Sequence, residues 1–191
     1  MRYGRKLQSK MAEKKQIQKR AFYDVEAPLT ATKIQLYGSS AEALDGKVIT
    51  LDLTRSLRGK SLELKMRVRF DGKKLLAEPV RLTLMGSYIR RAIRKGTDYV
   101  EDSFSVNCKD GLLLVKPYLI TRHKVHRALR RALRVAARKF LTGHCTTRNI
   151  KELFGELMAN KIQKELSLKL KKIYPLALCE IRWFEVVGKQ G

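Results

Sequence analysis

The sequence predicts an α+β fold, in which an antiparallel β-sheet or partial barrel carries peripheral helices and a basic N-terminal tail. Two stretches rich in strand patterns come first, helical patterns enter late, and a final strand pattern closes the chain. The length of 191 residues and the 44% hydrophobic content suffice for one domain with a substantial core.

Residues 1–20 predict a tail that stays disordered until it binds a partner, because they hold many cations and few apolar side chains. A single α+β domain is expected over 21–187, with 188–191 as a short C-terminal end. Three apolar anchors are expected at the entry to this domain: Phe22, Tyr23 and Val25.

Alternation of apolar and polar residues predicts the strands. The segment 62–70 alternates without a miss, and the Asp-Gly pair at 71–72 predicts a hairpin turn to a returning strand. A second hairpin is expected around the Asp-Gly pair at 110–111. Proline should interrupt two strands, with Pro79 near the start of one, at an edge or a bulge, and Pro117 within the other.

Helical periodicity marks 86–96 and two consecutive segments after 149, and alternation marks the strand that closes the chain. The segment 86–96, GSYIRRAIRKG, predicts a short helix with Ile89 and Ile93 inward and its cations outward. Asn149 and Glu152 have the spacing of a capping box at the start of a later helix. The strand that closes the chain is expected to place three side chains on one face: Cys179, Ile181 and Trp183.

A basic amphipathic helix is expected over 125–141. On a helical wheel, one arc collects apolar residues: Val125, Leu129, Ala132, Leu133, Ala136 and Phe140. The opposite arc collects arginines: Arg127, Arg130, Arg131, Arg134 and Arg138. No acidic residue lies between Asp110 and Glu152, so we expect the charge that neutralises this face to come from outside the chain.

The charge balance indicates a polyanionic partner, because 42 Lys and Arg residues against 18 Asp and Glu give a net charge of +24. Like charges stacked along a helix cost about 0.2–0.5 kcal/mol per pair, a cost that bound phosphates would offset. Arginine also suits bidentate phosphate contacts. Basic residues on several faces fit a protein embedded in folded RNA better than one docked on a duplex.

The candidate RNA-binding residues are Lys19, Arg20, Arg90, Arg91, Arg94, Lys95, Arg122, Lys124, Arg127, Arg130, Arg131, Arg134, Arg138 and Lys139. An alternative is that 125–141 is an amphipathic helix that binds an anionic membrane surface or, like a calmodulin target, a partner protein. Its apolar face is rich in alanine and has no Trp, which is weak for insertion into lipid.

We expect no catalytic residue, metal or cofactor, since the common nucleotide, metalloprotease and hydrolase motifs are absent. Four metal-capable residues lie in or near the basic helix: His123, His126, His144 and Cys145. Their spacing matches no zinc-ligand pattern. Three acidic residues form another group: Asp98, Glu101 and Asp102. Strand alternation puts the last two on opposite faces, so a shared Mg²⁺ is not expected.

The three cysteines are widely spaced and no signal peptide is evident, which predicts reduced thiols in the cytosol. No apolar run approaches the roughly 20 residues of a membrane span, and no membrane partner is expected.

The run KRAFYDVEAP at 19–28 resembles the entry motif K-x-W-Y-D-V-x-A-P of an archaeal and eukaryotic small-subunit ribosomal protein family, called eS-one or S-three-a. Further fragments follow in the family's order: TKI at 32–34, LDGKVITLDL at 44–53, LTL before the short basic helix, CKDGLLL at 108–114 and KKIYPL at 171–176. The chain differs in having Phe22 where the family usually has Trp, a shorter segment after Pro28, and little of the extension beyond Val187.

This resemblance implies a shortened form of a structural protein on the platform of the small ribosomal subunit, near the messenger exit. It implies binding to small-subunit rRNA and to neighbouring ribosomal proteins, with messenger RNA near the exit as a further candidate partner, and no catalysis. The implied location is cytoplasmic, on the ribosome, and nucleolar during assembly.

Overall fold

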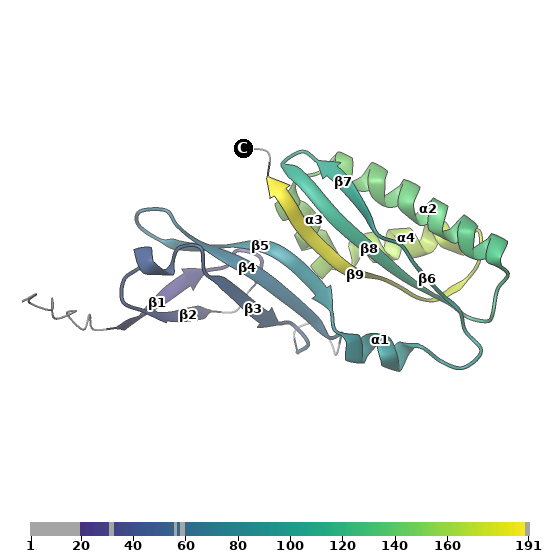
Figure 1. The fold of residues 1–191 in the computed structure, drawn as a ribbon, viewed down its shortest axis with the longest axis horizontal. Helices are drawn as coiled ribbons and strands as arrows, with labels where there is room; N and C mark the ends of the chain where they lie inside the picture. Colours follow the sequence, from purple (N-terminus) through teal and green to yellow (C-terminus); the bar gives the residue numbers. More distant parts are fainter. Residues whose placement is uncertain (1–19, 31–32, 56, 58–59, 190–191) are drawn as a thin grey trace, which may run out of the picture.

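The computed structural model describes residues 20–30, 33–55, 57 and 60–189 (Figure 1). In these residues the strands form one nine-stranded sheet: β1 (Ala21–Glu26), β2 (Ile34–Gly38), β3 (Val48–Asp52), β4 (Leu62–Phe70), β5 (Leu75–Leu84), β6 (Tyr99–Glu101), β7 (Phe104–Cys108), β8 (Gly111–Thr121) and β9 (Leu176–Lys189). The helices are α1 (Gly86–Ala92), α2 (Arg127–Thr146), α3 (Ile150–Met158), α4 (Lys161–Lys171) and the short 3₁₀ helix η1 (Glu42–Leu44). The α+β prediction is confirmed. The proposed tail, including Lys19, lies outside the described residues except for Arg20.

Strand β5 holds the sheet together. One of its edges pairs with β4 along its whole length. Its other edge is shared, in parallel by β1 at residues 75–76 and antiparallel by β9 at residues 81–83. The sheet is therefore antiparallel except for the short β1–β5 contact, and it stays open. We refer to residues 20–85 as the N-terminal half and to residues 86–189 as the C-terminal half.

The N-terminal half closes its core around η1. The apolar positions predicted in β4 from Leu62 to Val68 are buried, as the alternation required. Leu44 of η1 is fully buried and lies so close to Gly38 of β2 that a Cβ there would come within 2.8 Å of it. The N–H of Gly46 donates to the carbonyl of Val68 at 2.9 Å, which holds the segment after η1 on β4. Leu44 therefore acts as a plug between β2 and β4.

The C-terminal half covers its strands with α2, α3 and α4, which lie on one side of β7, β8 and β9 (Figure 1). The predicted capping box is present at α3, where the Glu152 carboxylate accepts the N–H of Asn149 at 3.3 Å. Phe154 of α3 meets Phe184 of β9 edge to face, with ring centres 5.1 Å apart. In this half the core is therefore covered by α-helices, whereas in the N-terminal half the short helix η1 packs against the strands.

A buried ion pair links the two halves. Lys60, just before β4, is 8% exposed and pairs with the Glu180 carboxylate of β9. Its Nζ also donates to Oδ1 of Asn160, between α3 and α4, at 2.6 Å. Burial raises the pKa of Glu180, while Lys60 opposes that shift. The cation therefore joins the N-terminal half to both a strand and a helical turn of the C-terminal half.

The two prolines predicted to interrupt strands both lie at irregularities of register. Pro79 lies opposite Met66 at a register shift, but in the middle of β5 rather than near its start. Between Lys116 and Pro117 the pairing of β8 with β9 shifts as well. Both irregularities are consistent with the missing proline N–H.

The second shift overturns the prediction that Trp183 lies on the same face of the strand as Ile181. Lys116 lies opposite Trp183 and Pro117 lies opposite Ile181, so Arg182 is an extra residue on β9. Such a bulge turns successive side chains to the same side. Ile181 is buried, whereas Trp183 is only half-buried. Strand β9 also continues past the predicted end at 187.

Two other apolar residues do not reach the core. Phe22 is 71% exposed and packs on Tyr37 of the neighbouring strand, with ring centres 5.1 Å apart. Ile93 is 43% exposed, because α1 ends at Ala92 before the predicted third turn can form. Gly96, with φ of +87°, belongs to a turn after the helix.

The cysteines are free thiols, with Cys108 and Cys145 buried and Cys179 half-buried. Burial raises the pKa of Cys145 and of Cys179 to about 12. These two thiols are therefore protonated and unreactive at neutral pH.

Candidate nucleic-acid interface

Helix α2 begins at Arg127, later than the predicted start at 125. The backbone N–H of Val125 donates to Oδ2 of Asp98 at 2.9 Å, and His126 has an extended conformation at the N-cap. At its other end the helix continues to Thr146, past the predicted end at 141. The amphipathic helix is present, but it is shifted toward the C-terminus.

The buried side of α2 is rotated from the predicted apolar arc. Its buried residues recur at every fourth position: Leu133, Ala137, Leu141 and Cys145. Ala132, predicted to face inward, is exposed, and Leu129 is half-buried. Each step of four residues turns the buried stripe by about 40° around the helix axis. The stripe that faces the core at Cys145 has therefore turned partly away from it at Leu129. Because this stripe packs in the protein, the alternative of a membrane or partner helix would require α2 to leave the sheet.

The arginines of α2 do not form one uniform face. Arg138 makes a bidentate ion pair with Asp102, with Nε and one terminal nitrogen 2.9 and 2.8 Å from the carboxylate oxygens. This hydrogen bond and the charge of Asp102 raise the pKa of Arg138. Nε of Arg134 donates to the backbone carbonyl of Glu101 at 3.1 Å.

The expectation that all neutralising charge comes from outside the chain is therefore wrong for Arg138. Asp102 lies between β6 and β7, far from α2 in sequence, and strand pairing with β8 brings it alongside the helix. Because Asp102 is 36 residues from Arg138 along the chain, the sequence around α2 does not indicate this partner.

The remaining cations of α2 have no such partner. Within the described residues, Arg127, Arg131 and Lys139 make no hydrogen bond or ion pair through their side chains, and all three are exposed. We call these three residues the free row. They line an open groove along α2 together with Arg130, Arg134 and the exposed Val135.

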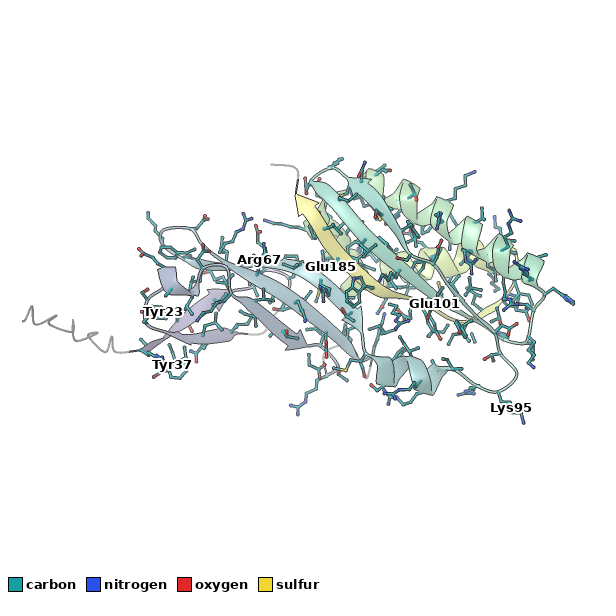
Figure 2. The ribbon with its side chains drawn as sticks, in the orientation of Figure 1. Tyr23, Tyr37, Arg67, Lys95, Glu101 and Glu185 are labelled. Atoms are coloured by element: carbon teal, nitrogen blue, oxygen red, sulfur yellow. The ribbon has the colours of Figure 1, made fainter. Side chains whose placement is uncertain are left out.

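Asp98 brings two separate basic segments together. The N–H of Thr121 donates to the carbonyl of Asp98 at 2.9 Å, and the carboxylate of Asp98 binds the segment after β8 through Val125. Arg94 and Lys95 precede Asp98 in sequence, and Arg122 and Lys124 follow Thr121. Figure 2 shows Lys95 at this end of the molecule, near the start of α2. We call Arg94, Lys95, Arg122 and Lys124 the basic end, and all four are exposed.

The other candidates lie apart from the free row. Arg90 is exposed on α1, whereas Arg91 lies 6.0 Å from the Tyr88 ring centre and 3.5 Å from the Ser61 hydroxyl. Arg20 lies over Tyr37 in the N-terminal half, 6.0 Å from the ring centre.

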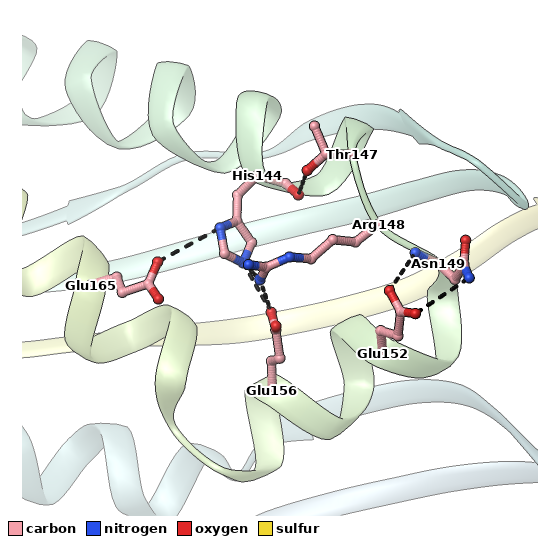
Figure 3. A network of polar contacts seen from close by, with 7 residues as sticks. All are labelled: His144, Thr147, Arg148, Asn149, Glu152, Glu156 and Glu165. Carbon is pink, nitrogen blue, oxygen red and sulfur yellow. Dashed lines mark hydrogen bonds and ion pairs between the residues drawn. The ribbon is translucent and has the colours of Figure 1, made fainter.

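The metal-capable residues are not brought together. His123 and His126 precede α2, whereas His144 and Cys145 lie near its far end. His144 belongs to a polar network that ties α2 to α3 and α4 (Figure 3). Its Nε2 is 3.0 Å from a Glu156 oxygen, its Nδ1 is 3.8 Å from a Glu165 oxygen, and Arg148 contacts both His144 and Glu156.

The predicted acidic group is dispersed among cationic and backbone partners. Asp98 accepts a backbone N–H, Glu101 pairs with Arg182 at 3.0 Å, and Asp102 pairs with Arg138. Among the described side chains, His, Cys, Asp and Glu form no group that could hold a metal ion. No helix in the described part of the chain is long and apolar enough to cross a membrane.

Comparison with known proteins adds to this geometry. The model of the ribosomal S3Ae family matches residues 8–190. The chain belongs to the ribosomal S3Ae family. The family resemblance inferred from short sequence fragments is thereby confirmed.

Curated relatives agree with this membership, and each is named small ribosomal subunit protein eS1. The relative from Desulfurococcus amylolyticus is 29% identical over 168 residues, 84% of this chain and 79% of the relative. That from Pyrobaculum islandicum is 29% identical over 143 residues, 74% of this chain and 64% of the relative. That from Nanoarchaeum equitans is 24% identical over 174 residues, 87% of this chain and 88% of the relative.

Membership in this S3Ae family gives the cationic surfaces a context. The α2 helix, the Asp98 connection and β9 all lie within the matched residues. One group of polar and aromatic residues was not among the sequence-predicted candidates: Arg81, Lys116, Arg182, Trp183 and Glu185. A strand bulge brings some of them to one side, and sequence alternation carries no signal of such a bulge.

Proposed function

We propose that this protein is a structural constituent of the small ribosomal subunit and binds rRNA through the free row of α2 and the basic end. The observation that carries the proposal is the free row, Arg127, Arg131 and Lys139, whose charges no described residue compensates. Phosphate suits such cations, because arginine and lysine bind it through charge-assisted hydrogen bonds. Family membership favours ribosomal RNA over other polyanions.

The proposal gives the α2 cations different roles. Arg127, Arg131 and Lys139 contact phosphates directly. Arg138 fixes α2 to Asp102 and thereby orients the free row. Arg134 uses only its Nε in its hydrogen bond to the Glu101 carbonyl, so its terminal nitrogens can still bind a phosphate. The basic end continues this surface beyond the start of the helix.

The same proposal includes a position on the platform near the messenger exit, contact with neighbouring ribosomal proteins and with messenger RNA there, and no catalysis. It includes a cytoplasmic location on the ribosome and a nucleolar stage of assembly. The location, the partners and the absence of catalysis are supported by the family resemblance, whereas RNA binding is supported by the free row.

Filter binding of the full chain to small-subunit rRNA over a series of salt concentrations tests the proposal. Each phosphate contact adds about 0.7–0.9 to the slope of log affinity against log salt. Replacing Arg127, Arg131 and Lys139 by Ala is expected to lower this slope by about 2–3. The circular dichroism spectrum should not change, because all three side chains are exposed.

A charge-matched control replaces Lys164, Lys171 and Lys172, which are exposed on and after α4. We expect this variant to keep most of the wild-type slope. Equal losses in the two triple variants would mean that net charge, not the free row, drives binding. A wild-type slope corresponding to fewer than about three phosphate contacts would contradict the proposal itself.

A further inference from the structure

Trp183 is the only tryptophan of the chain, and two cations lie close to its indole ring. The Arg81 guanidinium lies 4.4 Å from the centre of the indole ring, and Nζ of Lys116 lies 5.1 Å from it. The indole N–H donates to Glu185 at 2.9 Å, and Glu185 also accepts from Nε of Arg81 at 3.0 Å. Because its N–H is tied down, the ring is preorganised as a flat apolar surface.

Trp183 forms one wall of a pocket next to the bulge of β9. The pocket reaches from Trp183 and Arg182 of β9 across Lys116 of β8 to Glu101 of β6 and Arg134 of α2. The extra residue in the bulge brings Arg182 and Trp183, which are adjacent in sequence, into the same pocket. Bulges often redirect side chains next to binding sites.

The charges in the pocket leave an excess of cations. Its two carboxylates are already matched, Glu101 by Arg182 and Asp102 by Arg138 (Figure 2 labels Glu101). Lys116 makes no hydrogen bond or ion pair within the described residues, and Arg134 bonds only to a backbone carbonyl. The site therefore combines an aromatic ring with two cations, Lys116 and Arg134, that have no ion-pair partner among the described residues.

We propose that this pocket holds one unpaired nucleotide of the RNA bound by α2, with its base against the Trp183 indole and its phosphate between Lys116 and Arg134. This inference rests on the proposed function. Arg134 connects the pocket with the α2 surface, because it lines both this pocket and the groove of the free row. A strand that follows α2 thus passes the mouth of the pocket.

The chemistry favours a nucleotide over an acidic peptide. A peptide carboxylate uses the cations but has no need of the ring, whereas a base has a flat face that stacks on an aromatic side chain. Lys116 is a flexible chain, so on binding its ammonium exchanges the indole face for the phosphate. The pocket then binds the face of an unpaired base by stacking and makes no hydrogen bonds to the edge of the base.

Fluorescence of the full chain tests this directly, because Trp183 is the sole tryptophan. The probes are a single-stranded oligoribonucleotide, the same strand without bases, the same strand in a duplex, and an acidic peptide. We expect saturable quenching by the first probe only, while fluorescence anisotropy of labelled RNA records binding separately. Binding of the single strand without quenching, or equal quenching by an acidic peptide, would overturn the inference.

Variants separate this pocket from the free row. Trp183→Ala is expected to weaken single-strand binding by about 5- to 150-fold, the usual range for losing one stacked base, with duplex binding unchanged. Trp183→Phe keeps an aromatic ring, so its affinity for single-stranded RNA should fall much less. If Trp183→Ala does not fold, Trp183→Phe and wild-type quenching still decide the matter.

The outcomes also distinguish the inference from the proposed function. Wild-type protein that binds neither single-stranded nor duplex RNA contradicts the proposed function. If Trp183→Ala binds single-stranded RNA as tightly as the wild-type protein does, only the nucleotide pocket is contradicted.

Discussion

In the N-terminal half a short 3₁₀ helix, η1, packs Leu44 into the core, whereas in the C-terminal half three α-helices cover one face of the strands. The 3₁₀ helix η1 is only 3 residues long, but a sheet covered by α-helices places whole helices at the surface. Helix α2 spans 20 residues and buries only one stripe, so its other sides are open to a partner. The way in which each half closes its core thus determines which half can present a long row of cations.

Removing the cation that links the halves should have the largest effect on stability. Lys60→Ala leaves the buried Glu180 carboxylate without its charge partner, which costs about 3–5 kcal/mol in the free energy of unfolding. Urea unfolding followed by circular dichroism measures this loss. The exposed Lys47→Ala serves as control, with an expected change within about 0.5 kcal/mol.

A double replacement tests whether the loss of stability in Lys60→Ala comes from the unpaired charge of Glu180. Lys60→Met together with Glu180→Met removes both charges, and it should recover most of the stability lost in Lys60→Ala. If Lys60→Ala unfolds at the same urea concentration as Lys47→Ala, the ion pair does not link the halves energetically.

Next in size is the loss of the plug. Leu44→Ala should cost about 2–5 kcal/mol, because η1 cannot collapse into the cavity that remains. We expect amide hydrogen exchange to accelerate in β2 and β4 and to stay slow in α2. Leu141→Ala, a buried residue of α2, is the matched change in the other half and should show the reverse pattern. Equal acceleration in both halves after either change would mean that they open as one unit.

The smallest expected effect is a local response to acid at Glu185. Burial raises the pKa of this carboxyl, but hydrogen bonds from Arg81 and Trp183 outweigh it and lower the pKa below 4.5. The stability that Glu185 contributes is therefore present above pH 4.5 and is lost as the pH falls through the lowered pKa. Trp183 fluorescence should change in this acid range, and Glu185→Gln should abolish the transition. A wild-type transition centred above pH 4.5 would contradict the assignment.

Sequence patterns predict elements better than they predict contacts between distant elements. The alternation in β4 and the capping box at Asn149 are local, and both appear as expected. The partnership of Arg138 with Asp102 depends on how β6 and β7 pair with β8, which no local pattern encodes. The same holds for Trp183, whose direction is set by an extra residue in β9.

The candidate binding residues were predicted by charge, and charge alone treats them as equal. Arg127 and Arg138 share an arc on the helical wheel, yet of the two only Arg138 has a carboxylate partner among the described residues. Likewise, hydrogen bonds of Asp98 join the segment that follows Lys95 to the segment after β8. Sequence therefore identified the cationic helix, while side-chain pairing separates its free cations from its anchors.

The shared edge of β5 has a consequence for the order in which the chain is completed during synthesis. Strands β1 to β5 are made first and can pair with one another, but residues 81–83 wait for β9, about a hundred residues later. Until β9 emerges, a stretch of β5 edge lacks hydrogen-bond partners and Lys60 lacks its carboxylate. The nascent N-terminal half therefore exposes a site that another strand could occupy, and the arrival of β9 closes it.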